Sequence, residues 1–265
     1  MTTNHLSNPA RLGSTLRIGL NLVAFAAVLV INSLATSGRI GGTDTGELSD
    51  AYPSLFTPAG YVFSIWGLIY SLLIIFVIYQ ALPAQWNNVR LERLGLIFVW
   101  SCLLNCGWIF AWHYQQISLS WLLMLGMLVT LIFCYERLEI GKSRLKRTEA
   151  VALQLPFRIY LGWITVATVA NTAILLLELG FSGGRLAAPL TVLVLAVATG
   201  IGYLVLLRRA DVAFALVLVW AFAGIAVKQW GAEPLVVAGA LLGAVSLLIA
   251  IIPTVRFRRR MGTMT

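Results

Sequence analysis

Charged and reactive side chains are scarce in this sequence. Its 265 residues include only 10 acidic residues, 2 histidines and 3 cysteines, and charged residues make up 11% of the chain. Soluble globular domains carry about 25% charged residues, so that class is excluded. The sequence also lacks a serine–histidine–acid set, an HExxH motif and a pair of carboxylates within a hydrophobic run. Hydrolytic and metal-dependent catalysis therefore have no candidate residues, and we assign no catalytic and no metal-binding residue.

The three cysteines all fall within hydrophobic runs, at Cys102, Cys106 and Cys134. Cys102 and Cys106 are one helical turn apart, but no histidine or further cysteine stands at a spacing typical of metal sites. We interpret all three as small apolar packing residues.

Apolar sequence is abundant, with 60% hydrophobic residues and a mean hydropathy of +0.89. A helix that crosses the hydrocarbon core needs roughly 20 mostly apolar residues. Eight stretches meet this requirement, so we predict an all-α polytopic membrane protein with eight transmembrane helices. The expected spans are Ile18 to Leu34, Tyr61 to Tyr79, Leu94 to Trp112, Ile117 to Tyr135, Pro156 to Leu177, Ala187 to Leu207, Val212 to Val227 and Leu235 to Ile252.

The basic residues indicate how these spans are oriented. With the N-terminus inside, 16 of the 19 basic residues fall on the inner side, and only Arg39, Arg185 and Lys228 fall outside. This distribution follows the positive-inside rule and predicts that both termini are cytoplasmic. Because the basic residues are spread over all the inner loops, we expect contact with anionic lipid headgroups and no binding of nucleic acid.

The first hydrophobic stretch leaves a second interpretation open. Arg11 and Arg17 precede an apolar core that ends near the small residues Ala35 and Ser37, as in a cleavable secretory signal. Cleavage would leave seven helices.

The stretch Ala51 to Tyr70 joins a loop to an aromatic helix. Phe63, Trp66 and Tyr70 recur at helical spacing, so their rings lie on one face. The outer loop before this helix, residues 35–60, is longer than most connections between helices, and we expect it to fold over the mouth of the bundle. Near its end the loop contains Pro53, Pro58 and Gly60, which disfavour regular helix.

Polar and aromatic residues also form a stripe along one face of the third span and of the fifth span. Asn105 and Asn171 are costly to bury in hydrocarbon without a partner, so both should face protein or a cavity. Trp108 and Trp163 share the faces of these asparagines. Three stripes, from the second, third and fifth spans, therefore converge on one interior. The last three spans are rich in Leu, Val and Ala, and we interpret them as scaffold.

Three motifs stand in order along the chain. The first is Pro58-Ala59-Gly60-Tyr61-Val62-Phe63 followed by Trp66 and Tyr70, the second is Asn105 with Trp108, and the third comprises Pro156, Tyr160, Leu161, Trp163, Ala167 and Asn171. Together they resemble the TspO/MBR family of tryptophan-rich sensory or translocator proteins. The likeness covers roughly Ile18 to Leu177, and the whole chain resembles the long bacterial branch of that family. It departs from the family's usual pattern at Tyr61, Ser64, Ile65 and Phe110.

The resemblance implies a five-helix bundle that encloses a pocket beneath the first outer loop. Members of the family bind tetrapyrroles such as protoporphyrin IX, and some bind cholesterol or synthetic aromatic compounds. The predicted ligand-binding residues are Trp66, Tyr70, Asn105, Trp108, Tyr160, Trp163, Ala167 and Asn171. The resemblance implies all of them except Tyr70 and Tyr160, which share the same motifs. The predicted lid residues are Pro53, Phe56, Pro58, Gly60 and Tyr61, of which the last three follow from the resemblance.

The resemblance and the distribution of basic residues together predict three parts of the chain. Residues 1–17 form a cytoplasmic tail, residues 18–180 form the five-helix bundle with its outer loop, and residues 181–265 form a three-helix extension with a basic cytoplasmic tail. The expected location is the bacterial inner membrane, and the expected partners are the lipid bilayer, a hydrophobic small molecule and a second copy or a larger membrane complex.

These expectations favour a binding, sensory or carrier protein for a planar hydrophobic ligand, in particular a tetrapyrrole. No cofactor is required, although a porphyrin or another planar lipid is the expected ligand. Axial ligation of haem iron is not expected, because His5 lies in the tail and His113 at a helix end. Three alternatives stay open: facilitated transport of a lipid or tetrapyrrole, a structural role in a larger complex, and light-dependent breakdown of porphyrin. The absence of a carboxylate deep in any span argues against proton-coupled transport.

Overall fold

The computed structural model describes residues 9–143 and 145–262, and the side chains of residues 13–143 and 145–256. Residues 1–8 of the predicted N-terminal tail, Arg144 of the inner loop between the fourth and fifth predicted spans, and residues 263–265 of the predicted C-terminal tail lie outside the described residues.

Long helices make up most of the described chain, which contains no strand. The eight long helices are α1 (Pro9–Thr36), α3 (Ile65–Ala81), α5 (Ile97–His113), α6 (Ile117–Arg137), α8 (Leu155–Glu178), α9 (Ala187–Arg209), α10 (Val212–Lys228) and α11 (Pro234–Gly262). The short helices are α2 (Thr45–Asp50), η1 (Gly60–Ser64), η2 (Pro83–Gln85), α4 (Val89–Leu94), α7 (Arg147–Glu149), η3 (Ala150–Gln154) and η4 (Gly184–Leu186).

Each predicted span coincides with one long helix. Within the described residues, six helices are long and apolar enough to cross a membrane. The other two, α5 and α10, have 17 residues each and still reach across most of the hydrocarbon core. The predicted all-α polytopic fold is thus confirmed. The largest differences in length are at α1 and α11, which continue past their apolar stretches into segments that carry arginine.

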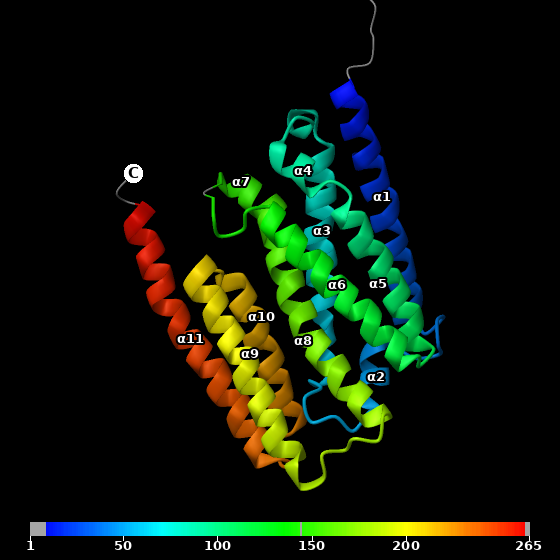
Figure 1. The fold of residues 1–265 in the computed structure, drawn as a ribbon, viewed down its shortest axis with the longest axis vertical. Coiled ribbons are helices and arrows are strands. Elements are labelled where there is room, and N and C mark those ends of the chain that lie inside the picture. Colours follow the sequence, from blue (N-terminus) through cyan, green and yellow to red (C-terminus); the bar gives the residue numbers. More distant parts are fainter. Residues whose placement is uncertain (1–8, 144, 263–265) are drawn as a thin grey trace, which may run out of the picture.

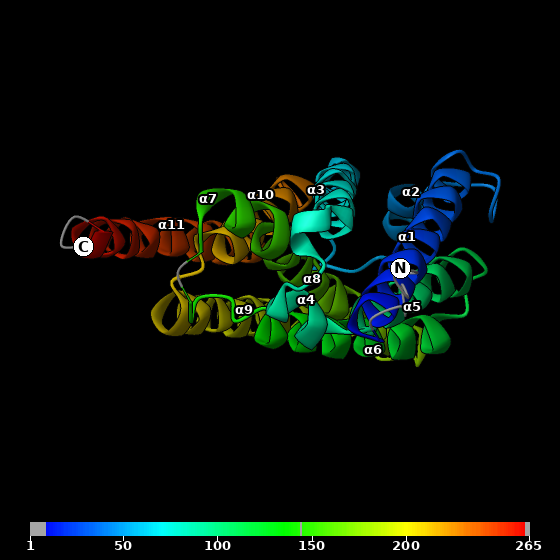
Figure 2. The ribbon, with the colours of Figure 1, turned by 90° about the horizontal axis from the view of Figure 1, so that it is seen from above.

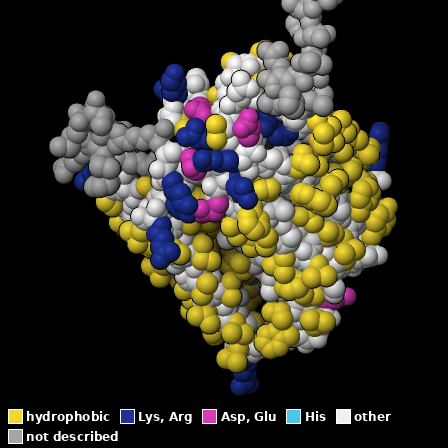
Figure 3. Space-filling view, turned by 45° about the horizontal axis from the view of Figure 1, so that its top comes forward, with side chains coloured by type: hydrophobic (Ala, Val, Ile, Leu, Met, Phe, Trp, Pro, Cys, Tyr) yellow, Lys and Arg dark blue, Asp and Glu magenta, His cyan; other side chains and the backbone are white. Residues whose placement is uncertain are grey.

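The two ends of the bundle differ in charge. Helix α1 begins and α11 ends at the same end (Figure 1). Figure 3 shows Lys, Arg, Asp and Glu side chains gathered toward this end, while apolar side chains cover the flanks below it. We call it the charged end; it includes Arg90, Arg93, Glu136 and Arg209. The opposite end, where α2 and the following loop lie, is called the lid end.

Two groups of helices lie side by side. Helices α1, α3, α5, α6 and α8 pack around one interior, whereas α9, α10 and α11 pack mainly on one another. Seen from above, α1 and α11 lie on opposite sides of the molecule (Figure 2). The groups meet chiefly where α10 packs on α8. Gly162 permits this contact, because a Cβ there would come within 3.0 Å of Val217 Cβ and 3.3 Å of Phe214 O.

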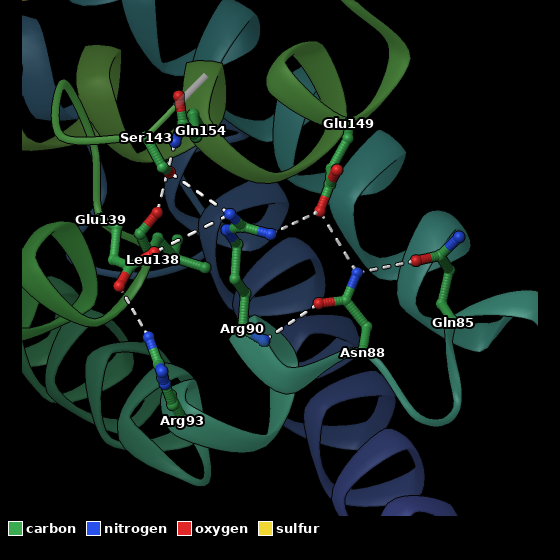
Figure 4. A network of polar contacts seen from close by, with 9 residues as sticks. All are labelled: Gln85, Asn88, Arg90, Arg93, Leu138, Glu139, Ser143, Glu149 and Gln154. Carbon is green, nitrogen blue, oxygen red and sulfur yellow. Dashed lines mark hydrogen bonds and ion pairs between the residues drawn. The ribbon is translucent and has the colours of Figure 1, made fainter. Parts of the chain in front are cut away.

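A polar network closes the charged end of the five-helix group. Arg90 reaches Glu149 at 3.3 Å, Glu139 at 3.8 Å and Ser143 Oγ at 3.4 Å. Arg93 pairs with Glu139 at 2.7 Å. Figure 4 shows that the network joins α4 to the segment after α6 and to α7. The short helix α4 is therefore fixed to the rest of the bundle.

Asp211 caps α10, as its place before an apolar run indicates. Its Oδ1 accepts a hydrogen bond from Phe214 N at 3.1 Å, and its Oδ2 accepts one from the Tyr135 hydroxyl at 2.8 Å. The side chain is fully buried, and Arg158 of α8 lies 3.9 Å away. The carboxylate therefore joins α6, α8 and α10 at the charged end.

Candidate functional site

Trp66 lies at the centre of a cluster of aromatic rings from α3, α5 and α8. It stacks on Tyr70, one turn further along α3, with centroids 5.4 Å apart and an interplanar angle of 21°. It lies 6.0 Å from Trp108, 6.3 Å from Trp163 and 5.8 Å from Tyr160. These separations suit favourable offset and edge-on contacts between rings. The stripes identified on three spans thus meet in one interior.

A chain of hydrogen bonds lies one turn further from the lid end. Asn32 of α1 donates to Asn105 Oδ1 at 2.8 Å, and Asn105 Nδ2 donates to the Tyr160 hydroxyl at 3.2 Å. That hydroxyl donates to the sulfur of Met127 at 3.0 Å. Asn105 is fully buried. Its polar groups are satisfied by protein partners, so Asn105 fixes the floor of the site through α1, α5 and α8.

A cavity of ≈ 30 Å³ lies between the aromatic cluster and the lid end. Three polar atoms of its lining residues are buried without a hydrogen-bond partner among the described residues: Trp108 Nε1, Trp163 Nε1 and Asn171 Oδ1. The amide of Asn171 donates to Ser120 Oγ at 3.0 Å, so only its oxygen is left unpaired. The cavity is lined by Ser49, Pro58, Phe63, Trp66, Trp108, Trp112, Met124, Trp163, Val166, Ala167, Ala170, Asn171 and Ile174.

The structure distributes the expected ligand-binding residues over two levels. Five of them line the cavity, and three lie away from it, around the hydrogen-bonded floor. Those on the cavity are Trp66, Trp108, Trp163, Ala167 and Asn171. Those at the floor are Tyr70, Asn105 and Tyr160.

The expected lid residues are also divided. Pro58 lines the cavity, whereas Pro53 and Phe56 line a groove on the other side of the loop. Tyr61 is 49% exposed and packs edge-on against Trp220 of α10, with centroids 5.6 Å apart. Gly60 has ordinary backbone conformation, and a Cβ there would lie 3.1 Å from Asp50 Oδ2. The loop therefore separates the cavity from the groove, and Tyr61 contacts α10.

We call residues 45–64 the lid. One side of the lid is held by the C-terminal end of α5. Thr45 Oγ1 lies 3.1 Å from His113 Nε2, and Trp112 Nε1 donates to Thr45 O at 3.4 Å. The ring of Tyr52 packs 5.8 Å from that of Trp112. Burial, with a smaller contribution from the charge of Glu178, raises the pKa of Tyr52, which therefore stays neutral at physiological pH.

Helix α10 holds the lid on its other side. Ala59 N donates to Gly224 O at 3.2 Å, and Trp220 Nε1 donates to Val62 O at 3.1 Å. Lys228 pairs with Asp50 at 2.6 Å. A direct bond from the lid backbone to a helix carbonyl requires close approach, and glycine at position 224 permits it. Helix α10, one of the three C-terminal helices, therefore fixes the lid that covers the site.

A larger groove lies behind the lid, between α8 and α9. Its volume is ≈ 470 Å³, and its lining residues include Ser54, Phe56, Thr172 and Thr191. Ser54 Oγ is buried without a hydrogen-bond partner among the described residues. The groove and the cavity share α8 and the lid as walls.

The sequence interpretation missed two parts of the site. The first is Asn32, which we did not assign to the site. An asparagine within the apolar run of the first span was a usable signal, because such a residue usually has a buried polar partner. The second is the contact of α10 with the lid, which involves Trp220, Gly224 and Lys228. A glycine in an apolar helix is common, so no sequence pattern pointed to this contact.

Replacing Asn105 by leucine should destabilise the bundle. The substitution removes the hydrogen bonds to Asn32 and Tyr160, and we expect a loss of about 1–2 kcal/mol from their net contributions. Thermal unfolding in detergent should show a lower midpoint. Ser71→Ala is the matched control, because it removes only a hydrogen bond to Gly67 within α3. Equal midpoints for the two variants would contradict the role assigned to Asn105.

Metal ligands do not gather in this region. In residues 9–143 and 145–262, no group of three His, Cys, Asp or Glu side chains lies close enough to hold a metal ion. The site offers aromatic faces, two indole N–H donors and one amide oxygen. Such groups suit a flat apolar ligand that carries a few polar atoms.

A family model described as TSPO-like protein matches residues 18–253. The match includes α9, α10 and most of α11, and so extends beyond the last recognised motif residue, Asn171. No curated protein and no solved structure matches the chain.

Proposed function

Because the chain belongs to the TSPO-like protein family, we propose that it binds a planar hydrophobic ligand in the cavity between Trp66 and the lid, as a sensor or carrier embedded in the membrane. The proposed ligand is a tetrapyrrole such as protoporphyrin IX. We further propose that both termini are cytoplasmic in a bacterial plasma membrane, so that the lid lies on the opposite side.

One observation carries the proposal. The cavity is lined by aromatic rings, yet three buried polar atoms on its lining residues have no partner within the described chain. An unsatisfied buried polar group costs about 1–3 kcal/mol. A ligand with hydrogen-bonding atoms at its edge would satisfy these groups while its faces stack on the indoles. The chemistry of the lining therefore suits a tetrapyrrole.

The size of the cavity requires a movement. Its ≈ 30 Å³ is far below the roughly 300–1,000 Å³ of pockets that hold small ligands. Helices packed through aromatic clusters move less readily than a loop, so we assign the opening to the lid. Displacing Phe56 and Pro58 would join the cavity to the ≈ 470 Å³ groove behind them. The combined space is sufficient for a planar ligand.

Titration tests this function directly. The full chain in nanodiscs is mixed with protoporphyrin IX, and the absorbance and fluorescence of the porphyrin are followed, with empty nanodiscs as the control. We expect saturable binding with one site per chain. A linear signal equal to that of empty nanodiscs would mean that the porphyrin only partitions into lipid, and would refute the proposal.

A further inference from the structure

A second pocket lies at the charged end, far from the lid. It has a volume of ≈ 380 Å³ and is formed by the first turns of α1, by α4 and by the residues that follow α4. Neither the aromatic cavity nor the groove beside α9 shares a lining residue with it. Its lining residues are Gly13, Ser14, Leu16, Arg17, Glu92, Gly95 and Leu96.

Arg17 is the unusual member of this pocket. Its side chain is only 7% exposed, yet Nε and Nη2 have no hydrogen-bond partner among the described residues. Burying a guanidinium without acceptors is unfavourable by several kcal/mol. Arg90 and Arg93, which lie on the neighbouring α4, both form ion pairs. The polar network at this end therefore leaves one buried cation without an acceptor for two of its donors.

Glu92 supplies the opposite charge in the same pocket. Its side chain is exposed and takes part in no ion pair within the described residues. It attracts the Arg17 guanidinium electrostatically but does not pair with it. The pocket thus has an unpaired carboxylate at its surface and a buried cation in its lining, whose two unpartnered donors a ligand reaches when the Arg17 side chain turns toward the pocket. This arrangement suits a ligand with both charges.

We propose that this pocket binds a phospholipid headgroup that carries a phosphate and a primary ammonium group, as in phosphatidylethanolamine. The guanidinium donors Nε and Nη2 form a planar fork that matches two oxygens of a phosphate. The ammonium group donates to the Glu92 carboxylate. Leu16 and Leu96 are 64% and 45% exposed at the rim, where acyl chains would lie. The charged end is the level at which apolar flanks give way to charged side chains (Figure 3), which is where headgroups lie.

Native mass spectrometry of the full chain tests the proposal. The protein is mixed in detergent with phosphatidylethanolamine, phosphatidylglycerol or phosphatidylcholine of identical acyl chains, and the bound fraction is measured. We expect phosphatidylethanolamine to bind about tenfold more tightly than either other lipid, a difference of about 1.4 kcal/mol. Arg17→Gln should abolish this binding, and Arg17→Lys should weaken it because the fork is lost. Glu92→Gln should keep a lipid bound but remove the preference over phosphatidylcholine, whose ammonium has no N–H.

The matched control is Arg137→Gln, since Arg137 is exposed at the same end and has no ion pair within the described residues. If Arg137→Gln and Arg17→Gln lose lipid binding to the same extent, the effect comes from the overall positive charge of this end, and the proposal is overturned. Equal binding of the three lipids, or displacement of lipid by inorganic phosphate alone, would also overturn it. Arg17→Gln should leave protoporphyrin binding unchanged, which confirms that the variant is folded and separates this site from the aromatic cavity.

Discussion

Trp163→Leu should weaken the binding of protoporphyrin IX at least tenfold. Trp163 is 1% exposed, contacts Phe63 and Trp66 edge-on, and presents an unpartnered indole N–H on a cavity-lining side chain. Leucine removes an aromatic contact worth about 0.5–1.5 kcal/mol beyond its area and also removes the hydrogen-bond donor. A loss of 1.4 kcal/mol already gives a tenfold change in affinity. The porphyrin signal is measured in the titration, because intrinsic fluorescence changes when a tryptophan is removed.

Trp100→Leu is the control for this substitution. Trp100 is also on a helix of the five-helix group, but its side chain is 60% exposed on the outer surface of α5. Its replacement should leave the affinity unchanged within about twofold. The pocket assignment is wrong if both variants bind as tightly as the native chain, or if both lose affinity to the same extent.

Gly224→Val should release the lid from α10. A Cβ at position 224 would overlap Val62 Cγ2 and come within 3.1 Å of Pro58 Cβ, both of which belong to the lid. The hydrogen bond from Ala59 N to Gly224 O would then break. Overpacking a buried contact costs about 1–3 kcal/mol, and we expect a loss near the upper limit because the overlap with the Val62 side chain is severe. The lid rather than the helix should move, because it has fewer packed neighbours.

Hydrogen–deuterium exchange measures this release. Residues 45–64 should exchange faster in Gly224→Val than in the native chain, and protoporphyrin should associate and dissociate faster. Gly200→Val is the control, because Gly200 lies on α9 with nothing within 4 Å of a Cβ. Unchanged exchange of the lid in Gly224→Val would contradict the role that we assign to α10.

The spans and their aromatic stripes were predictable from the sequence, because hydropathy and helical periodicity are local properties. Asn105 and Asn171 illustrate this. A polar side chain within an apolar run is expected to face protein or a cavity, and the structure provides Asn32 and Tyr160 as partners for Asn105, and Ser120 as the partner of the Asn171 amide nitrogen. What the sequence did not supply was the identity of these partners, since helix packing brings them together from distant parts of the chain.

The lid was predictable only in part. Proline and glycine indicate a loop after α2, but they do not determine which side chains turn toward the cavity. Pro58 faces it, whereas Tyr61 turns to Trp220 because α10 offers an aromatic edge there. The three C-terminal helices, interpreted as scaffold from their Leu, Val and Ala content, include the helix that holds the lid. The sequence around Gly224 does not indicate this contact, because glycine is common in apolar helices.

The central claim is that a planar ligand binds among Trp66, Trp108 and Trp163 beneath the lid. An experimental structure of the chain saturated with protoporphyrin IX tests it most directly. We expect density for the porphyrin in contact with these indoles and with Asn171, and a lid displaced from its contacts with α10. Porphyrin density confined to the groove between α8 and α9, with the aromatic cluster still closed, would contradict the claim.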